Sequence, residues 1–176
     1  MRDAALLGAR LLLGGYMGIH ASQKLLGKFH GPGLEVISGV FEDNGLYPGR
    51  EMALAASATE IAGGVLTITG IADPVGPLAV AGAMAVAAAF NRERGLMAAR
   101  NGVELPVVYA TLALTLAATG AGKYKIGPTI PGRLAAVGAL VGGVAAGALI
   151  AKMVTSKPAP AEVAGAEAGA APPAEA

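Results

Sequence analysis

Residues 52–71, MALAASATEIAGGVLTITGI, form an apolar stretch of 20 residues with a single ionisable side chain, Glu60, near its middle. A helix needs about 20 apolar residues to cross the hydrocarbon core of a bilayer. The neighbours of Glu60 at helical steps of three and four are all small: Ala53, Ala56, Ser57, Gly63, Gly64, Thr67 and Gly70. Small residues line the faces on which membrane helices pack closely. Glu60 is therefore predicted to point into a helical bundle and not into lipid.

Four further stretches are predicted to cross the membrane. They are residues 4–21, which contain Arg10, and residues 75–90, 103–120 and 134–151. The third and fourth predicted spans in chain order have a proline near their first turn, where the missing N–H costs little. We expect the first span to be an uncleaved helix, because the small-x-small pattern of a signal-peptide cleavage site is missing at its end.

The chain is thus predicted to be an all-α, polytopic membrane bundle with three parts. Residues 1–127 form a four-helix membrane domain, in which apolar residues at helical spacing near 33–44 predict a surface amphipathic helix. Residues 128–154 add a fifth transmembrane helix at the C-terminal side. Residues 155–176, rich in Ala, Pro and Glu, are expected to be a disordered tail.

Composition excludes several classes of function. Of the 176 residues, 54% are hydrophobic and only 14% charged, whereas a soluble domain has about a quarter charged. The net charge of +1 gives no reason to expect a nucleic-acid partner. The absence of cysteine excludes thiol catalysis, iron–sulfur clusters and cysteine zinc sites. Serine triads, phosphate-binding loops and metal-ligand spacings are also missing, so no metal site is predicted.

Basic residues near the helix ends predict the orientation, because they accumulate on the cytoplasmic side. One face of the predicted bundle would carry eight of them: Lys24, Lys28, Arg50, Arg92, Arg94, Arg100, Lys152 and Lys157. The other face would carry Arg2, Lys123, Lys125 and Arg133, and Arg10 as a fifth if its side chain snorkels that way. The protein is therefore expected in the plasma membrane, with its C-terminal tail in the cytoplasm.

Polar residues form an arc along the first predicted helix. Arg10 lies about 9 Å inside it at 1.5 Å per residue, and on a helical wheel it is within about 40° of Lys24. Arg10 can snorkel to the near interface, which is the simpler interpretation, or pair with Glu60. If Glu60 does pair with the first helix, Arg10 is the expected partner, ahead of His20. Glu60 is either a structural contact between helices or a group that handles a proton, an ion or a ligand.

His20 ends the same arc, beside Gln23 and Lys24. A structural role at the helix end and a role with a ligand or proton are both open. A haem held by two histidines of this chain is not expected, since His30 lies ten residues further on, beyond Gly27.

Five pieces of the chain, taken in order, resemble the DoxX family of small multi-pass membrane proteins. They are RLLLGGYMGIHASQKL, GPGLEVISGVFEDNGL, TEIAGGVLTITG, NGVEL and GAGKYKIG, and they span residues 10 to about 127. The family usually has four helices, so the fifth is an addition here. It often carries a histidine near the end of the third helix, where this chain has Asn91. The polar residues that fall in the family pattern are Arg10, His20, Gln23, Lys24, Glu60, Asn101, Glu104, Lys123 and Tyr124.

The resemblance implies a subunit or scaffold of a membrane redox or respiratory assembly that contacts quinone, in a complex with redox proteins or with copies of itself. The alternative is a small transporter or channel whose polar path is lined by Glu60, Arg10 and His20. An enzyme acting alone is disfavoured, because the chain contains no recognisable nucleophile or cofactor motif. The residues themselves predict no cofactor.

Overall fold

The computed structural model describes residues 1–134 and residue 137, and within them every regular element is a helix. The α-helices are α1 (Arg2–Leu26), α2 (Gly33–Asp43), α3 (Gly49–Thr69), α4 (Val75–Asn91) and α5 (Glu104–Thr119). Two 3-10 turns, η1 (Arg92–Arg94) and η2 (Ala98–Arg100), connect α4 to α5. The prediction of an all-α fold is confirmed.

Three of these helices, α1, α3 and α4, are long and apolar enough to cross a membrane, and α5 is a shorter apolar helix. Together with the family assignment below, this makes the protein a helical membrane bundle. The first helix is longer than predicted and runs on to Leu26, where Gly27 ends it in the left-handed conformation that glycine adopts without strain. The predicted fifth span and the tail lie outside the described residues.

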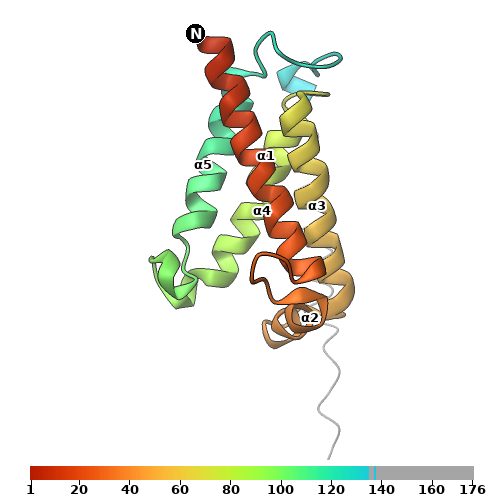
Figure 1. Ribbon diagram of the computed structural model, residues 1–176, viewed down its shortest axis with the longest axis vertical. Coiled ribbons are helices and arrows are strands. Elements are labelled where there is room, and N and C mark those ends of the chain that lie inside the picture. The colour runs from red at the N-terminus through yellow and green to blue at the C-terminus, as the bar shows by residue number, and fades with distance from the viewer. Residues whose placement is uncertain (135–136, 138–176) are drawn as a thin grey trace, which may run out of the picture.

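Helices α1, α3, α4 and α5 pack in a ring, with α2 at one end (Figure 1). α1 packs on α3, α3 on α4 and α4 on α5, and α1 also contacts α5. α2 lies at the end of the bundle where α1 ends and α3 begins. Residues 120–130 lie at the opposite end, near the N-terminus. This arrangement brings the polar C-terminal part of α1 next to the middle of α3 and the connection between α4 and α5.

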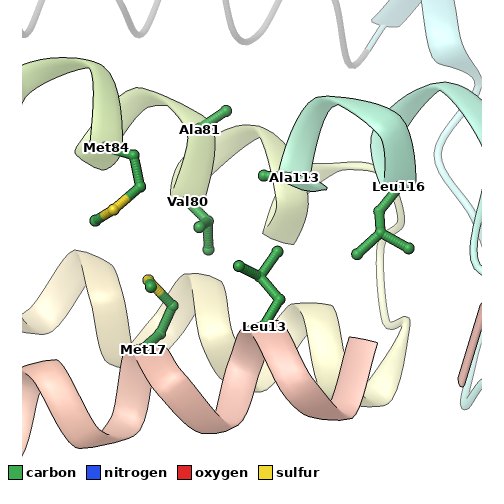
Figure 2. Packing of buried hydrophobic residues seen from close by; sticks show 7 residues of the cluster. All are labelled: Leu13, Met17, Val80, Ala81, Met84, Ala113 and Leu116. Atoms are coloured by element: carbon green, nitrogen blue, oxygen red, sulfur yellow. The ribbon is translucent and has the colours of Figure 1, made fainter. Parts of the chain in front are cut away.

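The apolar core lies between α1, α4 and α5 (Figure 2). It contains Leu13, Met17, Val80, Ala81, Met84, Ala113 and Leu116. Helix α3 instead buries the small face identified from the sequence, including Ser57, Gly63 and Thr67. Its large residues Ile61 and Val65 are 44% and 53% exposed, so they face away from the other helices. A face of small residues lets α3 approach its neighbours closely, as membrane helices do.

α1 and α3 approach each other closely at two glycines. A Cβ atom added to Gly64 would lie 3.1 Å from the carbonyl oxygen of Gly14, and one added to Gly14 would lie 2.6 Å from the carbonyl oxygen of Gly64. At Gly14 a side chain would also collide with that of Ile68, so it could not be added without a shift of α1 or α3, and at Gly64 it would make a tight contact. This contact sets the height at which His20 and Lys24 of α1 stand against Glu60 of α3.

Candidate functional site

A cavity of about 220 Å³ lies where α1, α3, α4 and α5 meet the α4–α5 connection. Its lining residues are His20, Lys24, Glu60, Met84, Ala87, Asn91, Ala98, Asn101, Gly102, Leu105, Pro106 and Tyr109. Four of the nine predicted site residues are thereby brought together: His20, Lys24, Glu60 and Asn101. The cavity combines a charged pair and neutral polar groups with an apolar wall, which is the usual make-up of a small-molecule site.

Glu60 is buried, as predicted, but its partner is not the predicted one. The ammonium of Lys24 donates to Glu60 Oε1, while Glu60 Oε2 is buried and accepts no hydrogen bond from the described residues. The expected pairing with Arg10 is therefore wrong, and so is the second choice, His20. The physical reason is position: Arg10 lies level with Thr67 and Ile68, about two turns of α3 beyond Glu60, where its guanidinium donates to backbone carbonyls.

His20 contacts an aromatic residue that sequence reasoning did not single out. Its ring meets that of Tyr109 edge to face, with centroids 5.5 Å apart. The ring of Tyr16 also lies against that of Tyr109, tilted by 37°, with centroids 5.6 Å apart. Edge-to-face packing of this kind holds both rings in defined orientations. His20 and Tyr109 thus form a polar, aromatic side of the cavity between α1 and α5.

The α4–α5 connection is folded tightly against the cavity. Glu104 Oε2 accepts the backbone N–H of Ala98 at 2.8 Å, and Asn101 takes the left-handed conformation that ends η2. Buried Gly102 donates its N–H to the Met97 carbonyl, and a Cβ atom there would collide with the backbone of Gly95. Glu104 therefore shapes the cavity wall without lining the cavity.

The remaining predicted residues lie elsewhere. Gln23 donates from its amide to the carbonyl of Phe29 at 3.2 Å and so holds the α1–α2 connection. Lys123 lies over the ring of Tyr124 at 5.2 Å in the segment after α5. Neither of these last two side chains lines the cavity.

Arg10 links α1 to the last turn of α3 and to the segment after α5, at the end of the bundle opposite α2. Its guanidinium is buried, with 2% of the residue exposed, and donates to the carbonyl oxygens of Thr67, Ile68, Ala121 and Tyr124. The expectation that Arg10 snorkels to the interface is wrong. Carbonyls in the last turn of a helix lack intrahelical partners, so the Arg10 cation caps α3 and complements its dipole.

Asp73, in the α3–α4 connection, belongs to the same end. It is 6% exposed, and its Oδ2 accepts the backbone N–H of Ala121 at 3.0 Å. Burial raises the pKa of the Asp73 carboxyl, and the Ala121 hydrogen bond and the positive charges of Arg10 and Lys125 partly offset that rise.

Because of the raised pKa of Asp73, we expect the stability of the folded protein to fall as pH rises. The folded protein holds the Asp73 proton more tightly than the unfolded chain, so the free energy of unfolding decreases from about pH 4 through the raised pKa. Asp73→Asn cannot ionise but keeps an oxygen that can accept from Ala121. Melting temperatures in detergent between pH 4 and 7 should show the variant gaining on the wild type as pH rises. A difference that stays constant with pH would contradict this assignment.

Tyr109, Asn91 and Asp73 carry signals too weak to be found from the sequence as site residues. Tyr109 is a lone aromatic residue in an apolar helix, and Asn91 stood out only as a departure from the family histidine. Asp73 precedes a proline in a short connection. Tyr109 and Asp73 become notable through contacts with residues distant in the chain, and Asn91 through its place in the cavity lining.

A family model described as DoxX matches residues 5–92, half of the chain. The chain belongs to the DoxX family. The DoxX match runs from α1 through α4 and includes His20, Lys24 and Glu60, but it ends before Asn101 and Tyr109. Searches for similar curated proteins and for similar solved structures found no match.

Proposed function

We propose that this DoxX-family membrane protein binds a quinone in the cavity and serves as the quinone-binding subunit of a membrane redox assembly. The observation that carries the proposal is the cavity itself, whose lining combines the ion pair of half-buried Lys24 and buried Glu60 with apolar side chains, within a bundle of membrane helices. A quinone has the same two-sided chemistry, with carbonyl oxygens on an apolar ring.

The lining residues fit such a ring. Hydrogen-bond donors for a quinone carbonyl are available in the Lys24 ammonium, the Tyr109 hydroxyl and the Asn101 amide. Met84 and Leu105 offer apolar contact for the ring faces. A volume of about 220 Å³ is small for a drug-sized ligand and suits a single ring whose apolar tail extends outside.

A partner protein has to supply the electrons. The chain has no cysteine to ligate an iron–sulfur cluster, and its two histidines are not both in membrane helices. Electron transfer to or from a bound quinone therefore needs a redox centre on another subunit. This is why we propose a subunit of an assembly and not an enzyme acting alone.

Filling the cavity tests quinone binding. Ala87 lines the cavity, whereas its α4 neighbour Ala85 is exposed and does not. Ala87→Phe should weaken binding of 2,3-dimethoxy-5-methyl-1,4-benzoquinone at least tenfold, because the phenyl ring occupies the space of the ligand. Ala85→Phe adds the same ring outside and should bind as wild type. Calorimetric titration of the proteins in lipid nanodiscs measures both; equal binding by the two variants would place any quinone site elsewhere.

Purification from native membranes in mild detergent tests the assembly. We expect a flavin-, haem- or cluster-containing protein to remain bound in a fixed ratio. Purification of the chain alone, or only with copies of itself, would contradict this part of the proposal.

The transporter alternative has less support, because Arg10 does not line the cavity with His20 and Glu60 but is bound to carbonyls at the other end of the bundle.

We further propose a plasma-membrane location with the α2 end of the bundle in the cytoplasm. Support comes from four basic residues at this end of the bundle: Arg50 near the start of α3, Arg92 and Arg94 in η1, and Arg100 in η2. Basic residues next to membrane helices favour the cytoplasmic side. Labelling of a cysteine placed at exposed Glu93 by an impermeant reagent should then require opened cells.

A further inference from the structure

The two oxygens of the Glu60 carboxylate are in different situations. Oε1 accepts from the Lys24 ammonium, while Oε2 is buried without a donor among the described residues. The Glu60 side chain is only 5% exposed and lines the cavity. A buried carboxylate oxygen without a hydrogen bond is costly, and nearly all such atoms in folded proteins have a partner. Because Glu60 lines the cavity, a ligand there can supply the missing donor once the carboxylate turns slightly towards it.

We propose that the cavity prefers the reduced hydroquinone to the oxidised quinone, an inference that rests on the proposed function. A quinone carbonyl can only accept a hydrogen bond, whereas a hydroquinone hydroxyl both accepts and donates. Lys24 has three N–H donors, of which Glu60 uses one. One hydroxyl group can therefore accept from Lys24 and donate to Glu60 Oε2, satisfying both members of the pair.

The charge of the cavity agrees with a neutral hydroxyl ligand. The charges of Lys24 and Glu60 cancel each other. The other titratable side chains in the lining are those of His20 and Tyr109. An anionic or cationic ligand would leave this pair with an uncompensated charge, which a buried site tolerates poorly. A hydroxyl group adds the missing donor without adding a charge.

The preference has a consequence for electron transfer. A ligand that binds more tightly in its reduced form has its midpoint potential raised, by about 30 mV for each tenfold difference in affinity of a two-electron couple. The bound quinone would then be a stronger electron acceptor than free quinone. The site would favour reduction of quinone by the partner subunit.

Titration of both redox forms tests the preference. The probes are 2,3-dimethoxy-5-methyl-1,4-benzoquinone and its hydroquinone, added anaerobically to the full chain in nanodiscs. We expect the hydroquinone to bind about tenfold to a hundredfold more tightly, the range for a hydrogen bond to a charged acceptor. Equal binding, or tighter binding of the quinone, would overturn the inference and leave the proposed function standing. Binding of neither form would remove the proposed function and the inference with it.

The variant Glu60→Gln tests whether the preference for hydroquinone depends on Glu60 Oε2. A glutamine can accept from Lys24 through its oxygen and turn its NH₂ donor to the ligand, so the preference for hydroquinone should disappear or reverse. Glu51→Gln, the same change at an exposed position of α3, should keep it. A preference that survives in Glu60→Gln would contradict the role of Oε2. If Glu60→Gln does not fold, the wild-type comparison of the two redox forms still decides the proposal.

Discussion

Arg10→Leu should destabilise the protein more than any other single change of a polar side chain in the described part of the chain. The guanidinium is the donor for four carbonyl oxygens, two in the last turn of α3 and two in the segment after α5. Leucine leaves these carbonyls without a donor in a buried place, where each unsatisfied group costs about 1–3 kcal/mol. We expect a loss of at least about 3 kcal/mol and little folded protein in the membrane.

Two further variants make this prediction specific. Arg10→Lys keeps the charge, but a single ammonium cannot reach four carbonyls as the planar guanidinium does, so it should lie between the wild type and leucine. Arg2→Leu is the matched control, because Arg2 is on the same helix and donates to one exposed carbonyl, that of Thr119, at 3.1 Å. It should change the melting temperature little. If Arg10→Leu melts in detergent at the same temperature as Arg2→Leu, the capping role of Arg10 is wrong.

Gly14→Leu should separate α1 from α3, whereas Gly15→Leu should not. A Cβ atom at Gly14 would lie 2.6 Å from the backbone oxygen of Gly64, which cannot move without displacing α3. At Gly15 no atom lies within 4 Å of an added Cβ. Overpacking of a tight contact costs typically 1–3 kcal/mol and more where backbone is involved, so we expect a loss of about 3 kcal/mol or more at Gly14.

The neighbouring glycine controls for helix propensity and hydrophobicity, because both variants replace glycine by leucine in the same turn of α1. Thermal melting in detergent, followed by size-exclusion chromatography, measures the difference. Gly14→Leu should also lose quinone binding, since moving α1 moves His20 and Lys24 away from Glu60. Equal melting temperatures would show that α1 and α3 do not depend on this close contact.

Periodicity and span length were sufficient to predict the α-helices of the described residues, because both depend on which residues avoid water. They also placed Glu60 in the bundle interior, since a face of small residues at helical spacing is a packing face. The partner of Glu60 could not be predicted in this way. Which cation reaches it depends on the relative height of α1 and α3, which the contact between Gly14 and Gly64 sets.

The role of Arg10 depends on a segment more than 100 residues away in the chain. The residues near Arg10 in the sequence give no sign that it will bind the carbonyls of Ala121 and Tyr124, so snorkelling was the simpler expectation. Tyr109 is similar: its side chain becomes part of the cavity only because α5 returns beside His20. Contacts between elements that are distant in the chain could therefore not be predicted from the pattern of a single sequence.

Photoaffinity labelling tests the quinone-binding site most directly. An azido-substituted benzoquinone is bound to the full chain in nanodiscs, activated by light, and located by peptide mass spectrometry. The account predicts labels on cavity residues between Met84 and Asn91 and between Asn101 and Tyr109, and predicts that excess unlabelled quinone removes them. Labels confined to outward-facing residues such as Leu114, which is 53% exposed, and unaffected by competitor would contradict it.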